Sequence, residues 1–178
     1  MRRIATILAL LPLAAVRPAL AETAFNGHVY AVVPVSGGIG WTQAKLAARQ
    51  RGCGWHLATL TSAAEDKFLA RLVAAAGAQV MVGRYGPWLG GYQHNSKAEP
   101  KGGWAWVTGE AFTYVHWAAS EPNNRTAGDP QFEPGIKAKQ SEEVLHYLAG
   151  GTWDDANVTA QAKGYVAERD SVQPQTCR

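Results

Sequence analysis

The sequence predicts an α+β domain, with its helices in the first half of the chain and short strands with long loops in the second. A helix-capping pattern followed by apolar residues at helical spacing predicts a helix between residues 62 and 77. From Pro87 onward, short β-like runs alternate with Gly, Pro and Asn, which is typical of strands joined by turns. Seven tryptophans and nineteen glycines indicate a loop-rich domain in which aromatic side chains anchor irregular segments.

Residues 1–21 are expected to be a secretory signal peptide and not part of the fold. This segment has a charged start, an apolar run and a small-residue cleavage signature, Ala19-Leu20-Ala21. A buried N-terminal helix fits poorly because two prolines interrupt the segment. We therefore expect residues 22–178 to be the mature domain, secreted or periplasmic and from a bacterial source. Its 157 residues are enough for one domain with a buried core.

The charge balance argues against a nucleic-acid partner. Cleavage after Ala21 removes three arginines and leaves 14 basic residues against 14 acidic ones. The basic character of the whole chain therefore comes largely from the targeting segment. No later stretch is long and apolar enough for a transmembrane helix. Two cysteines in an exported chain suggest one disulfide, Cys53 to Cys177, and two free thiols are the alternative.

The mature chain begins with a strand, a helix and a second strand. Residues 28–34 have the apolar pattern of a strand, and a glycine-rich turn follows at 37–40. Residues 41–50 are expected to form a helix, because a tryptophan and two alanines recur on one face. Residues 56–60 are expected to form the second short strand.

The second helix has the clearest boundaries. Ser62 and Glu65 form a capping box, in which the serine hydroxyl accepts from the Glu65 amide and the Glu65 carboxylate reaches back. Gly77 is a suitable C-terminal stop. The apolar residues at helical spacing between them are Phe68, Leu69, Leu72 and Val73.

The second half of the chain is expected to consist of strands and loops. The segment between Asn123 and Glu142 contains so many turn-forming residues that a long surface loop is expected there. Long ordered loops usually have a function. The β-like runs are residues 87–92, 103–109, 143–148 and 164–168.

Six motifs in order make the chain resemble the C-type lectin-like domain. The first helix, the following turn and the start of the second helix correspond to "WTQAKLAARQRGCGWHLATLTSAAED". "WLGGY" takes the place of the central Trp-x-Gly-Leu motif, although Gly91 stands where leucine is usual. The Trp-rich hairpin and the Glu-Pro-Asn loop correspond to "GWAWVTGEAFTYVHWAASEPNN", and the last two strands to "GTWDDANV" and "GYVAE". The resemblance runs from about Phe25 to Asp170 and implies two helices flanking small antiparallel sheets, with a long calcium-binding loop region.

Two disulfides that are usual in this family are absent from the chain. Alignment of the motifs puts Ala48 opposite Ala167 and Val144 opposite Val158 at the four cysteine positions. Each bridge is lost as a pair, which a consistent register predicts because no thiol is left unpaired. The two cysteines that are present lie near the same regions as the first of these bridges and could form a shifted bridge there.

The resemblance implies one calcium site built from two segments of the chain. Calcium takes six to eight oxygen ligands, which carboxylates and amide carbonyls can supply. In the family, Glu-x-Asn straddles a cis proline so that both side chains point at one ion, and Pro122 is a candidate for that cis bond. Trp153 is expected to pack inward and to orient the two aspartates that follow it. The expected calcium ligands are Glu121, Asn123, Glu142, Asp154 and Asp155.

The same residues are expected to bind a sugar. In the family, two vicinal hydroxyls each bind calcium, donate a proton to a carboxylate and accept one from an amide. The Glu-Pro-Asn order goes with equatorial 3- and 4-hydroxyls, so the chain resembles a mannose- or glucose-type lectin with a glycan or glycoprotein partner. The residues expected at the sugar are Glu121, Asn123, Glu142 and Asp154.

Asp154 departs from the family pattern, which has asparagine there. An ionised aspartate can bind calcium but has no N–H to offer a hydroxyl, so we expect sugar binding weakened by roughly 0.5–1.5 kcal/mol. The alternative function is a protein-binding module, an adhesin or inhibitor, that uses calcium only to stiffen its loops. An enzyme is not expected, because the sequence contains no HExxH and no Ser/His/Asp or Cys/His arrangement. The five histidines are expected to be structural, with His56 and His116 inside fold motifs.

Overall fold

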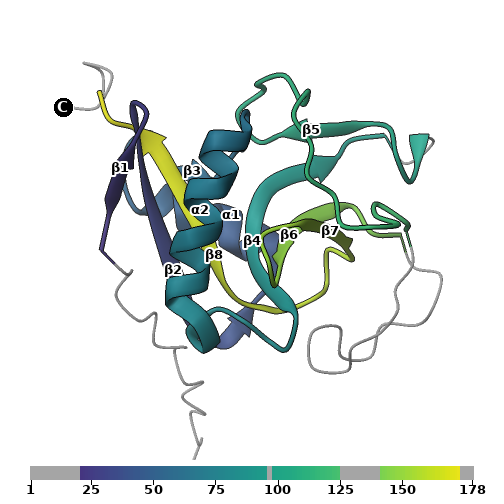
Figure 1. The fold of residues 1–178 in the computed structure, drawn as a ribbon, viewed down its shortest axis with the longest axis horizontal. Coiled ribbons are helices and arrows are strands. Elements are labelled where there is room, and N and C mark those ends of the chain that lie inside the picture. The colour runs from purple at the N-terminus through teal and green to yellow at the C-terminus, as the bar shows by residue number, and fades with distance from the viewer. Residues whose placement is uncertain (1–20, 96–97, 125–140, 173–178) are drawn as a thin grey trace, which may run out of the picture.

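The computed structural model describes residues 21–95, 98–124 and 141–172. Their strands form one connected sheet with two long helices packed on it (Figure 1). The predicted signal peptide, most of the predicted long loop and Cys177 lie outside these residues. The helices and strands are β1 (Thr23–Phe25), β2 (His28–Ile39), α1 (Trp41–Gln50), β3 (His56–Leu57), α2 (Ala63–Ala76), a short 3-10 helix η1 (Gly77–Gln79), β4 (Tyr85–Gln93), β5 (Trp104–Trp106), β6 (Val144–Leu148), β7 (Trp153–Ala156) and β8 (Ala162–Asp170).

The sheet pairs the first strands of the chain with its last strand, β8, and continues beyond β8 with β4, β6 and β7. Its strand order is β1-β2-β8-β4-β6-β7, with β3 paired to β8 and β5 paired to β4. All pairings are antiparallel except a single parallel contact, Trp88 with Tyr165, between β4 and β8. This contact connects the β1-β2-β8 part, which carries both helices, to the β4-β6-β7 part, which carries the candidate site.

The two helices cover opposite faces of the sheet, because side chains alternate between faces along β2. Ala31 and Val33 belong to a core cluster that includes the buried face of α1. Tyr30 and Val32 point the other way, into a cluster with α2 and the inner side chains of β6 and β7. In Figure 1, α2 lies in front of the sheet and α1 behind it. The predicted α+β fold class is therefore confirmed.

The helix boundaries agree with the sequence prediction, with one correction to the cap. The Ser62 hydroxyl accepts a hydrogen bond from the Glu65 amide at 3.3 Å, and Gly77 ends α2 with a φ of 52°. The Glu65 carboxylate does not complete the capping box at Ser62. It accepts instead from the Thr61 amide at 2.8 Å and from the Tyr30 hydroxyl at 2.5 Å. This buried carboxylate therefore ties the start of α2 to β2.

Two of the predicted strands have different lengths in the structure. The strand predicted at 28–34 continues to Ile39, because an irregularity in the pairing between Pro34 and Ile39 lets β2 stay beside β8. The strand predicted at 56–60 ends at Leu57. The next residue, Ala58, still makes backbone hydrogen bonds to two strands. Its amide donates to the Val166 carbonyl, and its carbonyl accepts from the Gly90 amide.

The four positions that replace the family's cysteines have different environments. Ala48 and Ala167 are both fully buried in the α1 cluster, as an apolar replacement of a bridge requires. Val144 is buried in the same cluster, whereas Val158 is 39% exposed. The second pair therefore does not form an equally buried contact.

Candidate metal centre

The chain brings the Glu-Pro-Asn loop beside the start of β7. Residues 116–118 run along this strand, where the Trp153 amide donates to the His116 carbonyl and the Ala118 amide donates to the Trp153 carbonyl, both at 2.9 Å. Trp153 is fully buried, as predicted, so the strand cannot rotate away from the core. A turn closed by Glu121 N–H on the Ala118 carbonyl then carries the loop to the two aspartates.

The β6-β7 hairpin fixes the aspartates themselves. Asp154 pairs with His146 and Asp155 with Leu145 across the two strands. The hairpin turn needs two residues with positive φ, and it has them in Gly150 and Gly151, at 96° and 86°. The register therefore holds two adjacent carboxylates at the strand end next to the loop.

Three of the five predicted ligands meet in one group. Carboxylate oxygens of Glu121, Asp154 and Asp155 all lie within 4.8 Å of one another. The Glu121–Pro122 peptide bond is cis, as predicted. Two unit charges 4.8 Å apart repel by about 3.5 kcal/mol at an effective dielectric constant of about 20. Such a group is stable only if a cation lies among the carboxylates or if at least one of them is protonated.

Asn123 adds an unsatisfied acceptor to this group. Its amide N–H donates to Asp155 Oδ1 at 3.0 Å, which places its side chain at the same site. Its Oδ1 atom is buried, and no donor among the described residues reaches it. A buried carbonyl oxygen without a donor costs about 1–3 kcal/mol, and a metal ion removes that cost. The three carboxylates and this oxygen form a set of hard donors that fits calcium.

The electrostatics of the aspartates show how unfavourable the group is without a cation. Burial, together with the negative charges of Glu121 and Asp155, raises the pKa of Asp154 to about 8. Burial also raises the pKa of Asp155, although the backbone N–H groups of Asn124 and Asn123 oppose that shift. Protons therefore occupy part of the group at neutral pH when no metal is bound.

Two basic residues approach Asp154 among the residues that the structure describes. Arg84 Nη2 lies 3.7 Å from Asp154 Oδ2, and His146 Nε2 lies at the same distance. Burial lowers the pKa of His146 to about 4, so its ring is neutral at physiological pH. Arg84 is therefore the cation that faces this carboxylate. Nothing in the sequence pattern indicated it, because it lies far from the site along the chain.

Glu142 is at the edge of the site. It is buried and its amide donates to Asn124 Oδ1 at 2.7 Å, but its carboxylate is not in the group of three. Its role as a ligand stays a prediction. Asn124, which the sequence analysis did not select, also donates its amide to Asp155 Oδ2 at 2.8 Å and its side-chain N–H to Glu99. Glu99 thus becomes a further acidic residue beside the site.

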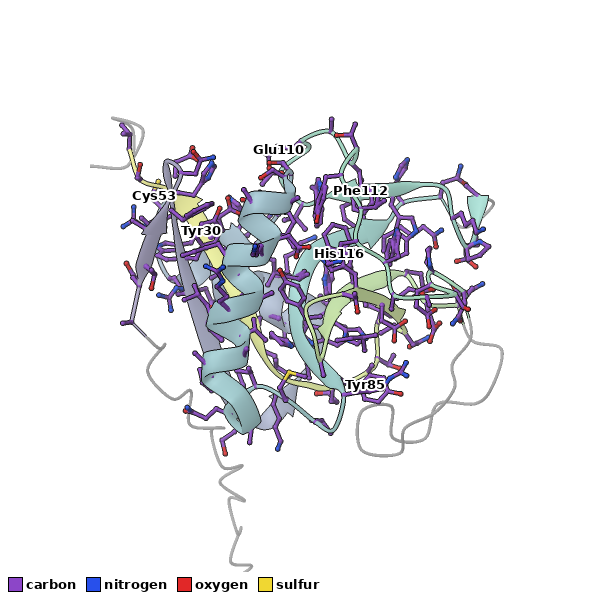
Figure 2. All side chains as sticks on the ribbon, in the orientation of Figure 1. Tyr30, Cys53, Tyr85, Glu110, Phe112 and His116 are labelled. Carbon is purple, nitrogen blue, oxygen red and sulfur yellow. The ribbon has the colours of Figure 1, made fainter. Side chains whose placement is uncertain are left out.

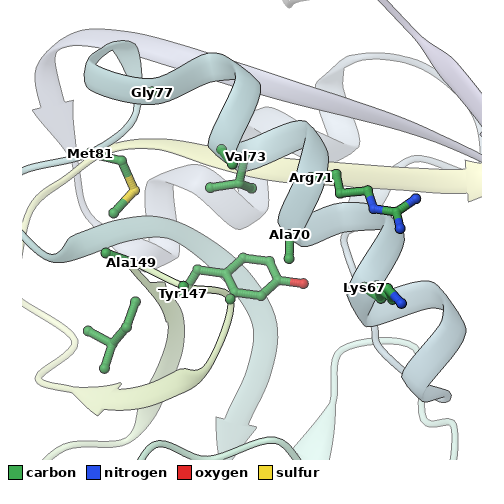
Figure 3. Close-up of a pocket in the computed structure, with 12 residues that line it drawn as sticks. Lys67, Ala70, Arg71, Val73, Gly77, Met81, Tyr147 and Ala149 are labelled. Atoms are coloured by element: carbon green, nitrogen blue, oxygen red, sulfur yellow. The ribbon is translucent and has the colours of Figure 1, made fainter.

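A well-formed cavity lies elsewhere in the described structure. It has a volume of about 400 Å³ and lies between α2 and the β6-β7 turn, with Lys67, Arg71 and Tyr147 around it (Figure 3). No carboxylate lines it, so it cannot serve as a calcium site. The acidic group, and not this cavity, is therefore the candidate metal centre.

Comparison with known proteins finds several similar curated sequences. No family model matches the chain. It is 38% identical over 84 residues to the C-type lectin lectoxin-Lio1 of Erythrolamprus poecilogyrus, covering 47% of this chain and 46% of that protein. It is 32% identical over 97 residues to mouse regenerating islet-derived protein 3-gamma, covering 53% and 51%. The chain thus spans about half the length of these curated relatives.

The solved structures extend the similarity over most of the chain. The C-type carbohydrate-recognition domain of cow CD23, determined in the presence of a GlcNAc2Man3 oligosaccharide, superposes with a TM-score of 0.63 at 22% identity. The match covers 89% of this chain and 99% of that domain. The chain therefore has the C-type lectin-like fold that the motifs predicted. The curated relatives are eukaryotic, so a bacterial source stays a prediction.

Proposed function

We propose that the chain is an exported, calcium-dependent lectin that binds glycans of the mannose or glucose type. The supporting observation is the group of Glu121, Asp154 and Asp155, whose carboxylate oxygens lie within 4.8 Å of one another beside the buried Asn123 Oδ1. Calcium, when bound, attracts lone pairs of two neighbouring sugar hydroxyls. Export agrees with the predicted signal peptide, and no helix among the described residues is long and apolar enough to cross a bilayer.

The protein's own side chains would then orient the sugar. At one hydroxyl, the Glu121 carboxylate accepts the hydroxyl proton and the Asn123 side-chain N–H donates to the oxygen. At the other hydroxyl, Asp154 and Glu142 are acceptors. A hydroxyl that gives one lone pair to calcium and its proton to a carboxylate still has one lone pair to satisfy. Recognition of a diol is therefore complete on the Asn123 side and lacks a donor among the predicted residues on the Asp154 side.

Calcium binding is tested by thermal unfolding of the mature domain in chelator and in millimolar calcium. Binding to the native state alone stabilises by about 2.7 kcal/mol at a calcium concentration of 100 Kd, which raises the Tm of a domain of this size by roughly 5–10 °C. Asp155→Asn should abolish most of this shift. Asp170→Asn, the same change at an exposed strand end, should keep it. An unchanged Tm in calcium would refute the proposal.

The second candidate is a protein-binding module that uses calcium only to stiffen its loops. It is favoured by the missing N–H at Asp154, since a glycan site is weakened there and a structural calcium site is not. Titration of mannose, glucose and N-acetylglucosamine at saturating calcium separates the two functions. Calcium stabilisation without binding of any sugar would favour the protein-binding module.

A further inference from the structure

The Asp154 side of the site needs a hydrogen-bond donor that the predicted ligands cannot supply. When they are ionised, Asp154 and Glu142 can accept hydrogen bonds but cannot donate them. His146 is near, but its Nδ1 lies 2.7 Å from the Tyr147 carbonyl and must donate to it. The His146 side chain is also only 1% exposed, so it does not face a ligand at the surface. Of the two basic side chains near Asp154 in the described part of the chain, Arg84 is the one that is exposed to a ligand.

Arg84 is in the required place. Its Nη2 lies 3.7 Å from Asp154 Oδ2, so a hydroxyl that donates to this carboxylate lies within reach of the guanidinium. The side chain of Arg84 is 60% exposed, whereas that of Asp154 is 10% exposed. Arg84 is therefore open to solvent beside a largely buried Asp154. Tyr85, which is labelled in Figure 2, directly follows Arg84 and begins β4.

Two contacts hold Arg84 without using up its donors. Its carbonyl accepts from the Ala149 amide at 2.7 Å, which fixes the backbone to the β6-β7 turn. Its guanidinium carbon lies 5.3 Å from the centroid of the Tyr85 ring, a cation–π contact that limits the side chain's freedom. Five N–H groups on a planar guanidinium leave donors for both Asp154 and a ligand.

The charge balance of the site gives Arg84 a second role. With Glu121, Asp154 and Asp155 ionised, three negative charges face the two positive charges of a calcium ion. A positive charge 3.7 Å from Asp154 offsets one of them. The extra negative charge of an aspartate at position 154 is thus balanced by a cation that also has donors.

We propose that Arg84 is a sugar-binding residue, and that Asp154 and Arg84 divide two tasks at one hydroxyl. Asp154 supplies oxygen to the metal and accepts the hydroxyl proton, and Arg84 donates an N–H to the same hydroxyl oxygen. The ligand class is a neutral glycan with a vicinal diol. This inference rests on the proposed function.

A double-mutant cycle tests the proposal with methyl α-D-mannopyranoside at saturating calcium, read by isothermal titration. Arg84→Met removes every donor and keeps the length of the side chain, so affinity should fall about tenfold, as for one charge-assisted hydrogen bond. In the Asp154→Asn background the asparagine supplies its own N–H, so Arg84→Met should change affinity less than about twofold. Arg84→Lys should retain most of the wild-type affinity. Arg49→Met, at the end of α1, should change nothing in either background.

The outcomes separate this inference from the proposed function. Equal affinities for wild type and Arg84→Met would overturn the role of Arg84 while leaving a calcium-dependent lectin intact. Equal losses in both backgrounds would mean a general charge effect, and would also overturn it. Absence of calcium stabilisation in wild type refutes the metal centre itself, and absence of sugar binding in all variants refutes both carbohydrate proposals. The Tm in calcium, measured for each variant, reports whether it is folded and loaded.

Discussion

Asp66→Ala is expected to lower the free energy of unfolding by about 4 kcal/mol, because one buried carboxylate accepts hydrogen bonds from four side chains. Asp66 lies in the first turn of α2 and is 2% exposed. It accepts from Tyr114 at 2.9 Å, His116 at 2.5 Å, Tyr147 at 2.7 Å and Trp153 at 3.2 Å. It therefore connects α2 to β6, to β7 and to the segment that leads to the Glu-Pro-Asn loop.

The magnitude follows from where these donors lie. Tyr147 and Trp153 are fully buried, so water cannot replace the carboxylate, and each unsatisfied donor costs about 1–3 kcal/mol. Tyr114 and His116 are closer to the surface and can turn to solvent, so they contribute less. For a domain of this size, a loss of about 4 kcal/mol lowers the Tm by roughly 8–16 °C.

Urea unfolding in the presence of chelator measures the effect without a contribution from metal binding. The matched control is Tyr114→Phe, which removes one of the four donors and should cost about 1 kcal/mol. A loss below about 1.5 kcal/mol for Asp66→Ala, or a loss equal to that of Tyr114→Phe, would show that the four hydrogen bonds do not act together as argued. Because Trp153 precedes the aspartates, Asp66→Ala should also weaken calcium binding.

Three further predictions follow from strain, titration and covalent linkage. Gly151→Ala should lower the free energy of unfolding by about 2 kcal/mol, since φ is 86° and the new Cβ would lie 2.7 Å from a side-chain carbon of α2. Without metal, the Tm should fall as pH rises from about 4 to about 8. Burial raises the pKa of both Asp154 and Glu168 to about 8, so the folded state keeps protons that the unfolded state has released in this window. Cys53 and Cys177 should be joined by a disulfide in the exported protein, which thiol counting under denaturing, non-reducing conditions measures.

Each of these predictions has its own contrary result. Gly150→Ala has a similar φ of 96° but meets no atom within 4 Å, so equal losses at the two glycines would remove the steric part of the argument. A Tm in chelator that rises between pH 5 and pH 8 would contradict the raised pKa values. Two free thiols per chain would contradict the disulfide. Cys53 lies at the end of the molecule where β8 finishes (Figure 2).

The two helices could be predicted from the sequence because their signals are local. Ser62 and Gly77 mark the ends of α2 by chemistry that acts within one turn, and the structure has its boundaries at these residues. The end of β2 could not be predicted in this way. Proline and glycine after residue 33 indicate a turn, but pairing with β8 across the irregular register keeps the strand extended to Ile39. Tertiary pairing, which the local sequence does not contain, decides that boundary.

The capping box also shows, at a single side chain, that tertiary contacts cannot be predicted from local sequence. The spacing of Ser62 and Glu65 predicted the hydrogen bond from the Glu65 amide, and that bond is present. It also predicted that the Glu65 carboxylate would turn back to the cap. The carboxylate is instead shared between Thr61 and Tyr30, since a buried acceptor satisfies the donors around it and β2 brings a hydroxyl into its reach.

At the candidate site, too, residues in recognisable motifs could be predicted, whereas residues that tertiary structure brings near them could not. Glu121, Asp154 and Asp155 could be selected from sequence, because the motifs that contain them resemble the calcium-binding loops of the C-type lectin-like domain and supply the oxygen ligands that calcium prefers. Arg84 could not, because a charge that compensates an aspartate can come from any segment that the fold brings near. From the sequence alone, Asp154 lacks the N–H that an asparagine at this position would donate to a hydroxyl. With Arg84 Nη2 3.7 Å away, the same position has both an acceptor and a donor. In the proposed lectin site, the unit that would recognise a hydroxyl is then a pair of side chains from two segments of the chain, and its function would depend on the pair rather than on either residue alone.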